Sequence, residues 1–478
     1  MTGLVVGLGV VLLVGLALRR IDLFVLVVLL VRTSLDAVRV PGPAGLDPAA
    51  LLGILLLGTA STWLLATWRR EGWPRLSPLA LASLAFAGAG LVGVAVAPAY
   101  AVALVEWTRL ASIAVTLLVV ERLAASATFR RRLVLVLLLA AVVPLSTAAV
   151  QVVRGEGLFE AGGFDRAVGT FTHPNPFAAY LSIVVVVALA QVVHRSETRL
   201  RLVCAAVAVL ASLGLLATYT RGAWLAALLG VAVVVALRQR RLLLGVAGAL
   251  VVVLLLVPGI AQRFGDLGDE ESLRGEPGNS LTWRFEYWSE ALDLASESPV
   301  TGIGLKQVAG ESLEGKQPHN DFLRAYVEMG LLGLLAFTLF VAQLVRTAVR
   351  GWARARGGPV ADRALAAAFA GVAAGYVLMS AVANLMSQVV VGVYLAALAG
   401  CVSALVQRGT DPALDPAFGP ALDPALDPAL HPALHTGPVP NNEHGRPPRA
   451  EEDPAGGTVE PGTGRRASAA GEAVTGGE

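Results

Sequence analysis

Long apolar runs restrict the fold of this chain more than any other feature. Thirteen of them approach the length of about 20 residues that a helix needs to cross a bilayer. They cover residues 3–18, 21–36, 49–68, 77–98, 100–120, 133–152, 176–193, 202–219, 222–237, 242–258, 326–346, 364–383 and 387–407. Hydrophobic residues make up 55% of the chain and charged residues 15%, which leaves too little polar surface for a soluble protein. The sequence predicts an all-α polytopic membrane protein with about twelve to fourteen transmembrane helices.

The number of spans depends on the N-terminal region. The first two runs are short and separated only by Arg19 and Arg20. A tight hairpin and two full spans both fit this pattern, so the orientation of the N-terminus stays open.

The charge of the loops alternates sharply along the chain. Arginines cluster after the apolar runs that end at 68, 120, 193, 237 and 346, whereas the loops near 37–48 and 99–104 hold only Arg39. Cytoplasmic loops carry the excess of Lys and Arg in membrane proteins. We therefore expect a multi-pass protein of the cytoplasmic membrane, with residues 153–175 and 259–325 facing outward.

Composition divides the chain into parts. We predict a transmembrane domain over 1–408 that contains, at 259–325, an extracytoplasmic polar loop able to host aqueous chemistry. From 409 onward the sequence Asp-Pro-Ala-Leu recurs, and then Gly, Pro, Glu and Arg follow without periodicity. Proline every fourth residue removes helix donors, and the apolar content is too low for a core. Residues 409–478 are expected to form a disordered cytoplasmic tail without a catalytic role.

Charge and cysteine content argue against several classes of protein. A net charge of +2 is too small to indicate a nucleic-acid partner. The two cysteines, Cys204 and Cys401, both lie inside apolar runs, so we expect neither a disulfide framework nor a cysteine-based metal site.

Arg221 lies between two apolar runs that have almost no linker, in the sequence Thr-Arg-Gly-Ala-Trp. The charge alternation places it at the outer membrane boundary. An arginine at this depth is costly unless it is paired, and is a functional candidate. The alternative is a topological stop with Trp224 as an interfacial residue. A lone outer arginine contradicts the positive-inside bias, so we favour a functional role.

Arg284 belongs to a predicted amphipathic helix over 279–299. The spacing puts Glu286, Glu290, Asp293 and Glu297 on one face, and Arg284, Trp288, Ala291, Leu292 and Ala295 on the other. A guanidinium on the apolar face needs an anion from elsewhere in the protein. An interfacial anchor whose arginine reaches lipid phosphate fits the same pattern, and both interpretations stay open.

Two histidines precede apolar runs. His319 follows Pro318 and precedes Asn320 and Asp321, where an imidazole can titrate near neutral pH and act as a general base. A capping or hydrogen-bonding role is the ordinary alternative for a single histidine. His173 precedes Pro174 and Asn175, which suit the start of a helix and form a turn that can contact substrate.

Four segments together resemble the bacterial O-antigen ligase and O-antigen polymerase superfamily, whose members are polytopic glycosyltransferases. They are Arg166-Ala-Val-Gly-Thr-Phe-Thr-His-Pro-Asn175, Thr220-Arg-Gly-Ala-Trp224, Trp283-Arg-Phe-Glu-Tyr-Trp288 with Gly302-Ile-Gly304, and Pro318-His-Asn320 with Glu328-Met-Gly-Leu-Leu-Gly333. The similarity spans about residues 130–405 and implies a GT-C-like fold. The earlier helices match only in being hydrophobic.

The resemblance implies a reaction and a site. The family transfers glycans from polyprenyl-diphosphate carriers, so Arg221 and Arg284 would hold the diphosphate, and His319 would be the catalytic base. Arg166, His173, Asn175 and Asn320 are assigned to substrate binding. Guanidinium forks suit phosphate oxygens, so no divalent metal or other cofactor is expected, and a single displacement would invert the anomeric carbon. The acceptor would be a lipid, wall polymer, protein or glycan, and the resemblance does not separate ligase from polymerase.

Two other classes remain as alternatives. A lipid-linked-glycan flippase would need polar residues in corresponding positions of two halves, and Glu106, Arg109 and Asn384 form no such repeat. A metal-dependent lipid-phosphate-sugar transferase would need paired acids in an early outer loop, but Asp36 and Asp47 stand apart.

Overall fold

The computed structural model describes residues 2–36, 48–161, 163–195, 197–256, 281–312 and 315–408. All of them lie in the first of the two units into which the chain divides, Met1–Pro420. The predicted tail over 409–478 and Asp47 lie outside the described residues, as does a large part of the predicted polar loop, at 257–280.

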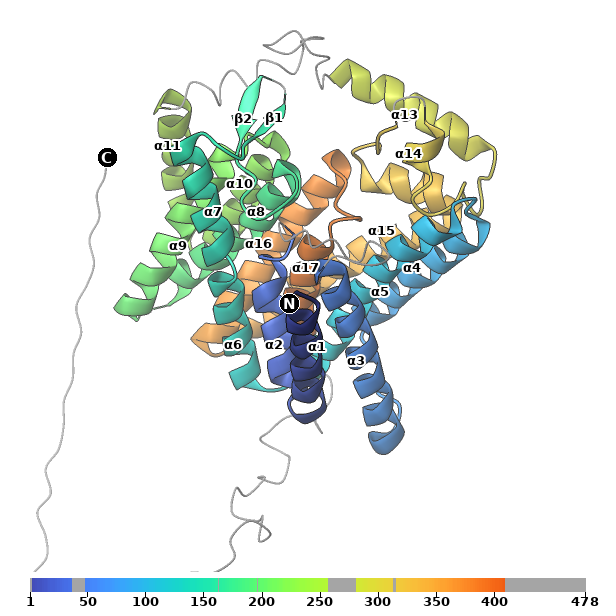
Figure 1. Ribbon diagram of the computed structural model, residues 1–478. Coiled ribbons are helices and arrows are strands. Elements are labelled where there is room, and N and C mark those ends of the chain that lie inside the picture. The colour runs from blue at the N-terminus through green and yellow to red at the C-terminus, as the bar shows by residue number, and fades with distance from the viewer. Residues whose placement is uncertain are drawn as a thin grey trace, which may run out of the picture. The chain divides into compact units, whose positions relative to one another are not determined.

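The described residues are mostly helical (Figure 1). The helices are α1 (Thr2–Arg19), α2 (Ile21–Arg32), α3 (Pro48–Glu71), α4 (Pro78–Val96), α5 (Tyr100–Leu123), α6 (Ala127–Leu139), α7 (Val142–Arg154), α8 (Pro174–His194), α9 (Thr198–Ala217), α10 (Arg221–Arg238), α11 (Leu242–Leu256), α13 (Leu281–Ser296), α14 (Val308–Glu311), α15 (Asp321–Ala355), α16 (Val360–Val382) and α17 (Val389–Arg408). The strands β1 (Phe159–Ala161) and β2 (Phe164–Arg166) pair antiparallel as a short hairpin.

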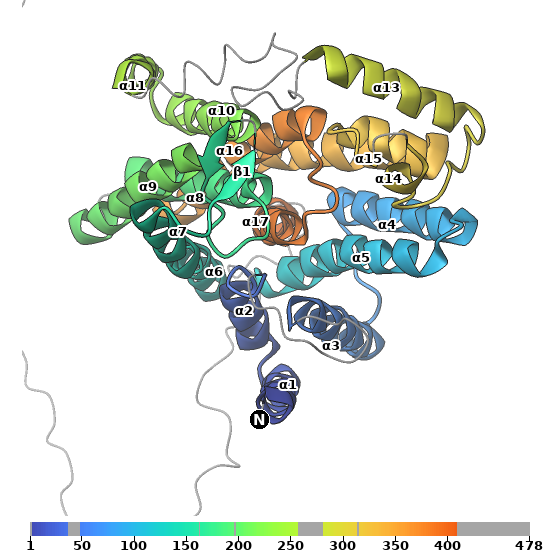
Figure 2. The same ribbon diagram turned by 45° about the horizontal axis from the view of Figure 1, so that its top comes forward.

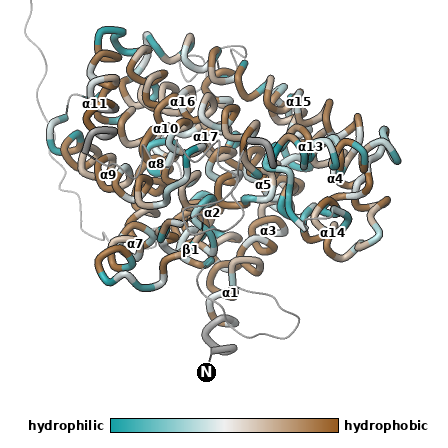
Figure 3. Tube along the Cα trace, turned by 90° about the horizontal axis from the view of Figure 1, so that it is seen from above, coloured by the Kyte–Doolittle hydropathy of each residue, from teal (hydrophilic) through white to brown (hydrophobic). Residues whose placement is uncertain are grey.

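The predicted fold class is confirmed, and every predicted apolar run coincides with a helix. Ten helical segments in the described part of the chain are long and apolar enough to span a membrane. They include α6 and α7 together, because Ala140 and Ala141 only bend the run that was predicted as one span. The number is smaller than the thirteen predicted, because α2 has only 12 residues, α11 only 15, and the apolar helix found within α1 is the shorter Gly7–Arg19. In Figure 3 hydrophobic residues cover these helices, and hydrophilic residues gather at the connections.

Helix α17 lies in the centre of the bundle and is almost wholly buried. It packs against α5, α15 and α16, and also contacts α8. Helices α8, α9, α10 and α16 pack together on one side of it, and α3, α4, α5 and α15 on the other (Figure 2). Alanine and glycine allow close approach between these helices. For example, a Cβ on Gly371 would lie 2.5 Å from the carbonyl oxygen of Gly230 in α10.

Two segments of the predicted resemblance meet at a kink in α15. Gly330 has φ 61°, and a Cβ there would lie 2.2 Å from the carbonyl of Val300. The backbone N–H of Leu331 instead donates to Pro299 O at 2.9 Å, and that of Gly304 donates to Glu328 O at 3.1 Å. Only glycine combines this positive φ with such close backbone contact. The kink therefore fixes the 299–305 segment against α15.

The arginine-rich connections contact one another at one set of helix ends. Arg130 at the start of α6 forms an ion pair of 2.9 Å with Asp362 at the start of α16. Arg122 at the end of α5 pairs with Glu71 at the end of α3. The opposite ends of α5 and α16 lie with the connections that were predicted to face outward. The pattern of contacts fits the predicted alternation, while the orientation in the membrane stays a prediction.

Candidate active site

A cavity of about 320 Å³ lies where the predicted outward connections meet. It is lined by residues from the β2–α8 connection, the start of α10, α13, the segment before α15 and the end of α16. The lining residues are Arg166, Thr172, His173, Asn175, Pro176, Tyr219, Thr220, Arg221, Gly222, Arg284, His319, Met379, Val382, Ala383, Asn384, Leu385 and Gln388. Six of the seven predicted site residues therefore meet in one cavity. The seventh, Asn320, is outside its lining.

Arg166 organises the wall of the cavity. It is 6% exposed, and its Nε donates to Thr218 O at 2.7 Å. Its Nη2 donates to Asn175 Oδ1 and to Thr220 Oγ1, both at 2.8 Å. The guanidinium thus ties β2 to the start of α8 and to the α9–α10 turn. Arg166 therefore supports the wall of the cavity, and its predicted role in substrate binding stays a prediction.

His173 caps α8 and has a defined tautomer. Its Nδ1 accepts a hydrogen bond of 3.1 Å from the backbone N–H of Asn175, and Pro174 follows as the first helical residue, as predicted. Because Nδ1 is an acceptor, the neutral ring carries its proton on Nε2. Burial, together with the nearby Arg166, lowers the pKa of His173 to about 4. At neutral pH His173 is therefore an uncharged hydrogen-bond donor in the cavity wall.

Arg221 is the first residue of α10, directly after a strained turn. Tyr219 has φ 48° and stacks on Phe164 with 4.7 Å between ring centroids, while Trp224 donates to Leu215 O at 2.9 Å. These contacts hold the turn between α9 and α10, so Arg221 lies in the cavity lining at a helix N-terminus. Backbone N–H groups and the helix dipole at that position favour an anion, as the guanidinium does.

Helix α13 confirms the predicted amphipathic pattern with one exception. The predicted acidic face is more exposed than the opposite face, where Ala291 and Ala295 are buried against α15. Leu292 was predicted on the packed face but is 48% exposed, and Tyr287 is buried instead. The packed stripe is centred nearer Tyr287 and Ala291 than expected, because the helix also covers the segment before α15.

Arg284 lies one turn before the aromatic residues Tyr287 and Trp288, and it lines the cavity. Its Nη1 donates to the carbonyl of Val382, the last residue of α16, at 3.3 Å. Of the two interpretations of Arg284, this placement favours an internal anion site over a lipid anchor. Burial lowers the pKa of Arg284, although a guanidinium stays charged at any physiological pH.

The aromatic residues of α13 hold the segment that carries His319. Trp288 Nε1 donates to Pro318 O at 2.6 Å, and the Tyr287 hydroxyl contacts both Lys316 O and Ser312 Oγ. His319 itself has φ 51°, an unfavourable conformation for a residue with a side chain. Strain of this kind persists where surrounding contacts enforce it, and it often marks a functional position. Helix α13 thus positions Arg284 and His319 together.

Electrostatics keep the His319 imidazole neutral. Burial, together with Arg284, His173 and Lys316, lowers its pKa to about 4. Across the described lining, three guanidiniums and two imidazoles face the cavity, and no carboxylate is among them. The arrangement suits a ligand with several negative charges.

Asn320 caps helix α15 and does not line the cavity. Its Oδ1 accepts hydrogen bonds from the backbone N–H groups of Phe322 and Leu323, at 3.0 and 3.1 Å, and caps α15. Its predicted role in substrate binding is thus left without support from the cavity geometry.

Sequence reasoning missed the wall formed by residues 383–388, between α16 and α17. Asn384, Leu385 and Gln388 from this segment line the cavity. The Oδ1 atom of Asn384 is buried and has no hydrogen-bond partner within the described residues. Asn384 lies in an apolar stretch, and this was the signal that could have assigned it to the site.

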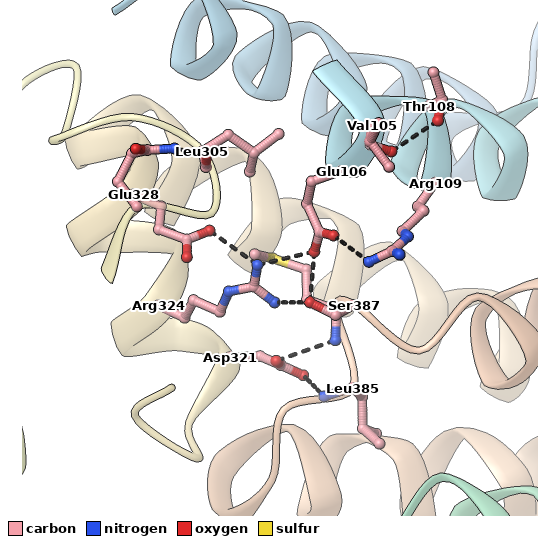
Figure 4. Close-up of polar contacts among 12 residues, drawn as sticks. Val105, Glu106, Thr108, Arg109, Leu305, Asp321, Arg324, Glu328, Leu385 and Ser387 are labelled. Carbon is pink, nitrogen blue, oxygen red and sulfur yellow. Dashed lines mark hydrogen bonds and ion pairs between the residues drawn. The ribbon is translucent and has the colours of Figure 1, made fainter. Parts of the chain in front are cut away.

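A buried charged cluster supports this wall from behind (Figure 4). Arg324 of α15 is fully buried and pairs with Glu106 of α5 at 2.9 Å and with Glu328 at 3.0 Å. Ser387 lies between them, where it accepts from Arg324 and donates to Glu106. Asp321 accepts the backbone N–H groups of Leu385 and Met386, at 3.0 and 3.1 Å. Because Asp321 is two residues after His319, the same short segment carries the candidate base and anchors the opposite wall.

Of the isolated acids, Asp36 is described and pairs with Arg32 at 2.5 Å. Glu106 and Arg109, which were noted as exceptions among plain apolar spans, bind each other at 2.7 Å beside the cluster. Neither Asp36 nor Glu106 lines the cavity.

Comparison with known proteins agrees with this geometry. No curated protein matches the chain. Residues 206–338, which include Arg221, Arg284 and His319, match the protein family described as O-antigen ligase. This match confirms the predicted resemblance and supports membership of the chain in the O-antigen ligase/polymerase superfamily.

Proposed function

We propose that the protein is a glycosyltransferase that moves a glycan from a polyprenyl-diphosphate carrier to an acceptor hydroxyl, at the outer face of the cytoplasmic membrane. The observation that carries the proposal is the meeting of Arg221, Arg284 and His319 in the lining of one cavity. The three residues come from separate segments, with 63 positions from Arg221 to Arg284 and 35 from Arg284 to His319, and all lie inside the matched family segment.

Arg221 and Arg284 would bind the diphosphate of the donor. The leaving group gains negative charge as the glycosidic C–O bond breaks, and fixed cations in a buried site stabilise that charge without reorganisation. Guanidinium forks bind phosphate oxygens in pairs, and the N-terminus of α10 adds backbone donors. These groups would supply the charge neutralisation that divalent metals supply in other transferases.

His319 would act as the general base. Its neutral imidazole accepts the proton of the acceptor hydroxyl as that oxygen attacks the anomeric carbon. The new C–O bond forms while the bond to the diphosphate breaks, and the diphosphate leaves with the electron pair. A single displacement of this kind inverts the anomeric carbon. His173, as a neutral donor, and the amide of Asn384 would hydrogen-bond sugar or phosphate oxygens.

The acceptor distinguishes the two activities within the family. A ligase attaches a finished glycan to a lipid, wall polymer or protein, whereas a polymerase adds it to another repeat unit. We place the ligase first, and the polymerase uses the same donor site and the same chemistry. A flippase is the remaining alternative, and it predicts translocation of a lipid-linked glycan without bond formation.

The test is reconstitution of the purified full-length protein with a labelled polyprenyl-diphosphate oligosaccharide and a panel of acceptors. Wild type is expected to transfer the label with inversion, and Arg221→Ala, Arg284→Ala and His319→Ala to lose transfer by about 10²–10⁴-fold each. Lys316→Ala is the matched control, because it removes a cation near His319 that does not line the cavity.

Circular dichroism and thermal melting identify variants that fail to fold. Normal turnover in any two of the three cavity variants would refute the site. Movement of labelled carrier across the bilayer without transfer would favour the flippase. Transfer that stops on addition of a chelator and returns with a divalent metal would refute the metal-independent mechanism.

A further inference from the structure

A second cavity lies beside the first turns of α5, apart from the catalytic cavity. It has a volume of about 390 Å³ and is lined by Ala101, Val102, Val105, Glu106, Arg109 and Lys306. One side is apolar, and the other carries two cations and one carboxylate. None of these residues lines the catalytic cavity, and none has a role in the proposed reaction.

The carboxylate of this cavity, that of Glu106, already accepts three hydrogen bonds. Glu106 is 1% exposed, and its Oε1 accepts from Arg324 and from Ser387, at 2.9 and 2.5 Å. Its Oε2 accepts from Arg109 Nη1 at 2.7 Å. Arg109 and Arg324 share this carboxylate, and Glu328 gives Arg324 a second one, so two guanidiniums are matched by two carboxylates.

Arg109 is exposed at a position where a charged side chain would contact the hydrocarbon of the bilayer, which costs free energy. It lies within the candidate span Tyr100–Leu123, yet its side chain is 40% exposed. A guanidinium that faces the hydrocarbon needs an anion or water to lower its energy. Glu106 binds Nη1 of this guanidinium, and the rest of the side chain borders the cavity.

Lys306 adds a second cation at the same cavity. Within the described residues its ammonium has no hydrogen bond or ion pair, and its backbone has φ 66°. The Leu305 N–H donates to Gly93 O at 3.0 Å, which fixes this strained segment against α4. Burial lowers the pKa of Lys306, Arg324 and Arg109 also lower it, and Glu106 and Glu328 act in the opposite direction. These neighbours together with Lys306 are three cations and two carboxylates, so the group keeps one positive charge in excess, which an anionic ligand would balance.

The apolar side of the cavity continues onto an exposed surface of α5. Val102 and Val105 are 51% and 55% exposed, and Tyr100 and Leu104 beside them are also exposed. In a membrane-spanning helix such a surface faces lipid chains. A ligand that fits the whole cavity therefore carries an anionic head and an apolar chain.

We propose that this cavity binds an anionic phospholipid of the bilayer. Its phosphate contacts Lys306 and Arg109, and an acyl chain lies along Val102 and Val105. The charge pattern selects a net negative headgroup, because a zwitterionic lipid would bring its own cation toward the two protein cations. We choose a bilayer phospholipid because the cavity continues onto the exposed apolar surface of α5, whereas the proposed site of the diphosphate donor is the other cavity, which Arg221 and Arg284 line.

The test uses full-length protein in nanodiscs of phosphatidylcholine with one tenth phosphatidylglycerol. Native mass spectrometry of the released protein counts the lipids that stay bound. Wild type is expected to retain one phosphatidylglycerol in preference to phosphatidylcholine, and Lys306→Gln to retain it about tenfold less, as for loss of one charge-assisted hydrogen bond. Lys306→Gln is the main variant because it breaks none of the ion pairs of the cluster.

The control variants separate this site from general charge effects. Lys306→Arg is expected to keep the lipid, and so is Lys316→Gln, which removes the chain's other lysine. Equal retention in wild type and Lys306→Gln would overturn the proposal, as would an equal loss in Lys316→Gln. Displacement of phosphatidylglycerol by added undecaprenyl diphosphate, with the same dependence on Lys306, would assign the cavity to the substrate carrier and also overturn it.

Discussion

The candidate catalytic cavity and the buried charged cluster both contain arginines, but the surroundings of their guanidiniums differ. Arg324 is fully buried, and two carboxylates and a serine surround its guanidinium. Arg221 and Arg284 face a cavity whose described lining has two imidazoles and no carboxylate. An arginine enclosed by buried carboxylates serves the fold, whereas arginines that meet with imidazoles in the lining of a cavity suit an anionic ligand.

Arg324→Ala tests the structural half of this comparison and has the largest expected effect. It leaves Glu106 and Glu328 buried without their shared cation, and breaking a buried ion pair costs about 3–5 kcal/mol. We expect a large loss of folded protein, measured by detergent-solubilised yield and thermal melting. Arg284→Ala is the matched comparison and should melt close to wild type while losing transfer. A stable Arg324→Ala, or an unfolded Arg284→Ala, would contradict the distinction.

Arg221→Lys and Arg284→Lys test what the cavity requires of its cations. Lysine keeps the charge but lacks the planar fork that binds two phosphate oxygens. We expect kcat/KM to fall by about 10–100-fold in each variant, with little change in melting temperature. Measuring the rate against donor concentration checks this. Full activity in both lysine variants would show that charge alone suffices.

The pH profile sharpens the role assigned to His319. Its pKa of about 4 makes the imidazole neutral and able to accept a proton at neutral pH. Activity should thus be level near pH 7 and be lost as the pH falls through the pKa. The acidic limb of the pH profile of kcat/KM reports the pKa of His319 in the free enzyme. The acidic limb of the kcat profile should lie at higher pH, because a bound diphosphate stabilises the imidazolium and raises that pKa.

Two variants check that assignment. Arg284→Ala removes a cation that lowers the pKa of His319, so its acidic limb should move to higher pH. His319→Gln should lose the limb together with most of the rate. An unchanged limb in the residual activity of His319→Gln would assign the titration to another group.

Removal of residues 409–478 has the smallest expected effect. The Asp-Pro-Ala-Leu repeat cannot build a core, so the truncated protein should insert and transfer at the wild-type rate. Loss of turnover in a well-expressed truncation would show that the tail takes part in function.

The sequence predicted what depends on local pattern. Hydrophobic runs predicted the helices, and Pro174 and Asn175 predicted the start of α8. Amphipathic spacing placed Arg284 opposite the acids of its own helix. These features depend on neighbouring residues, which periodicity and capping rules describe.

The remaining features depend on contacts between distant segments. Asp321 bonds to Leu385 and Met386, and Arg324 bonds to Glu106, which is 218 residues away. No rule of sequence spacing relates such distant positions, so the sequence did not predict the cavity wall at 383–388 or the charged cluster. Leu292 was misplaced because the packed stripe of α13 is set by the segment that α13 covers.

The most direct measurement of the central claim is the structure of the protein with a polyprenyl-diphosphate donor bound and no acceptor present. The account predicts both phosphorus atoms in the catalytic cavity, in contact with the guanidiniums of Arg221 and Arg284, and the anomeric carbon toward His319. A diphosphate bound instead beside Arg109 and Lys306, with the catalytic cavity empty, would contradict it.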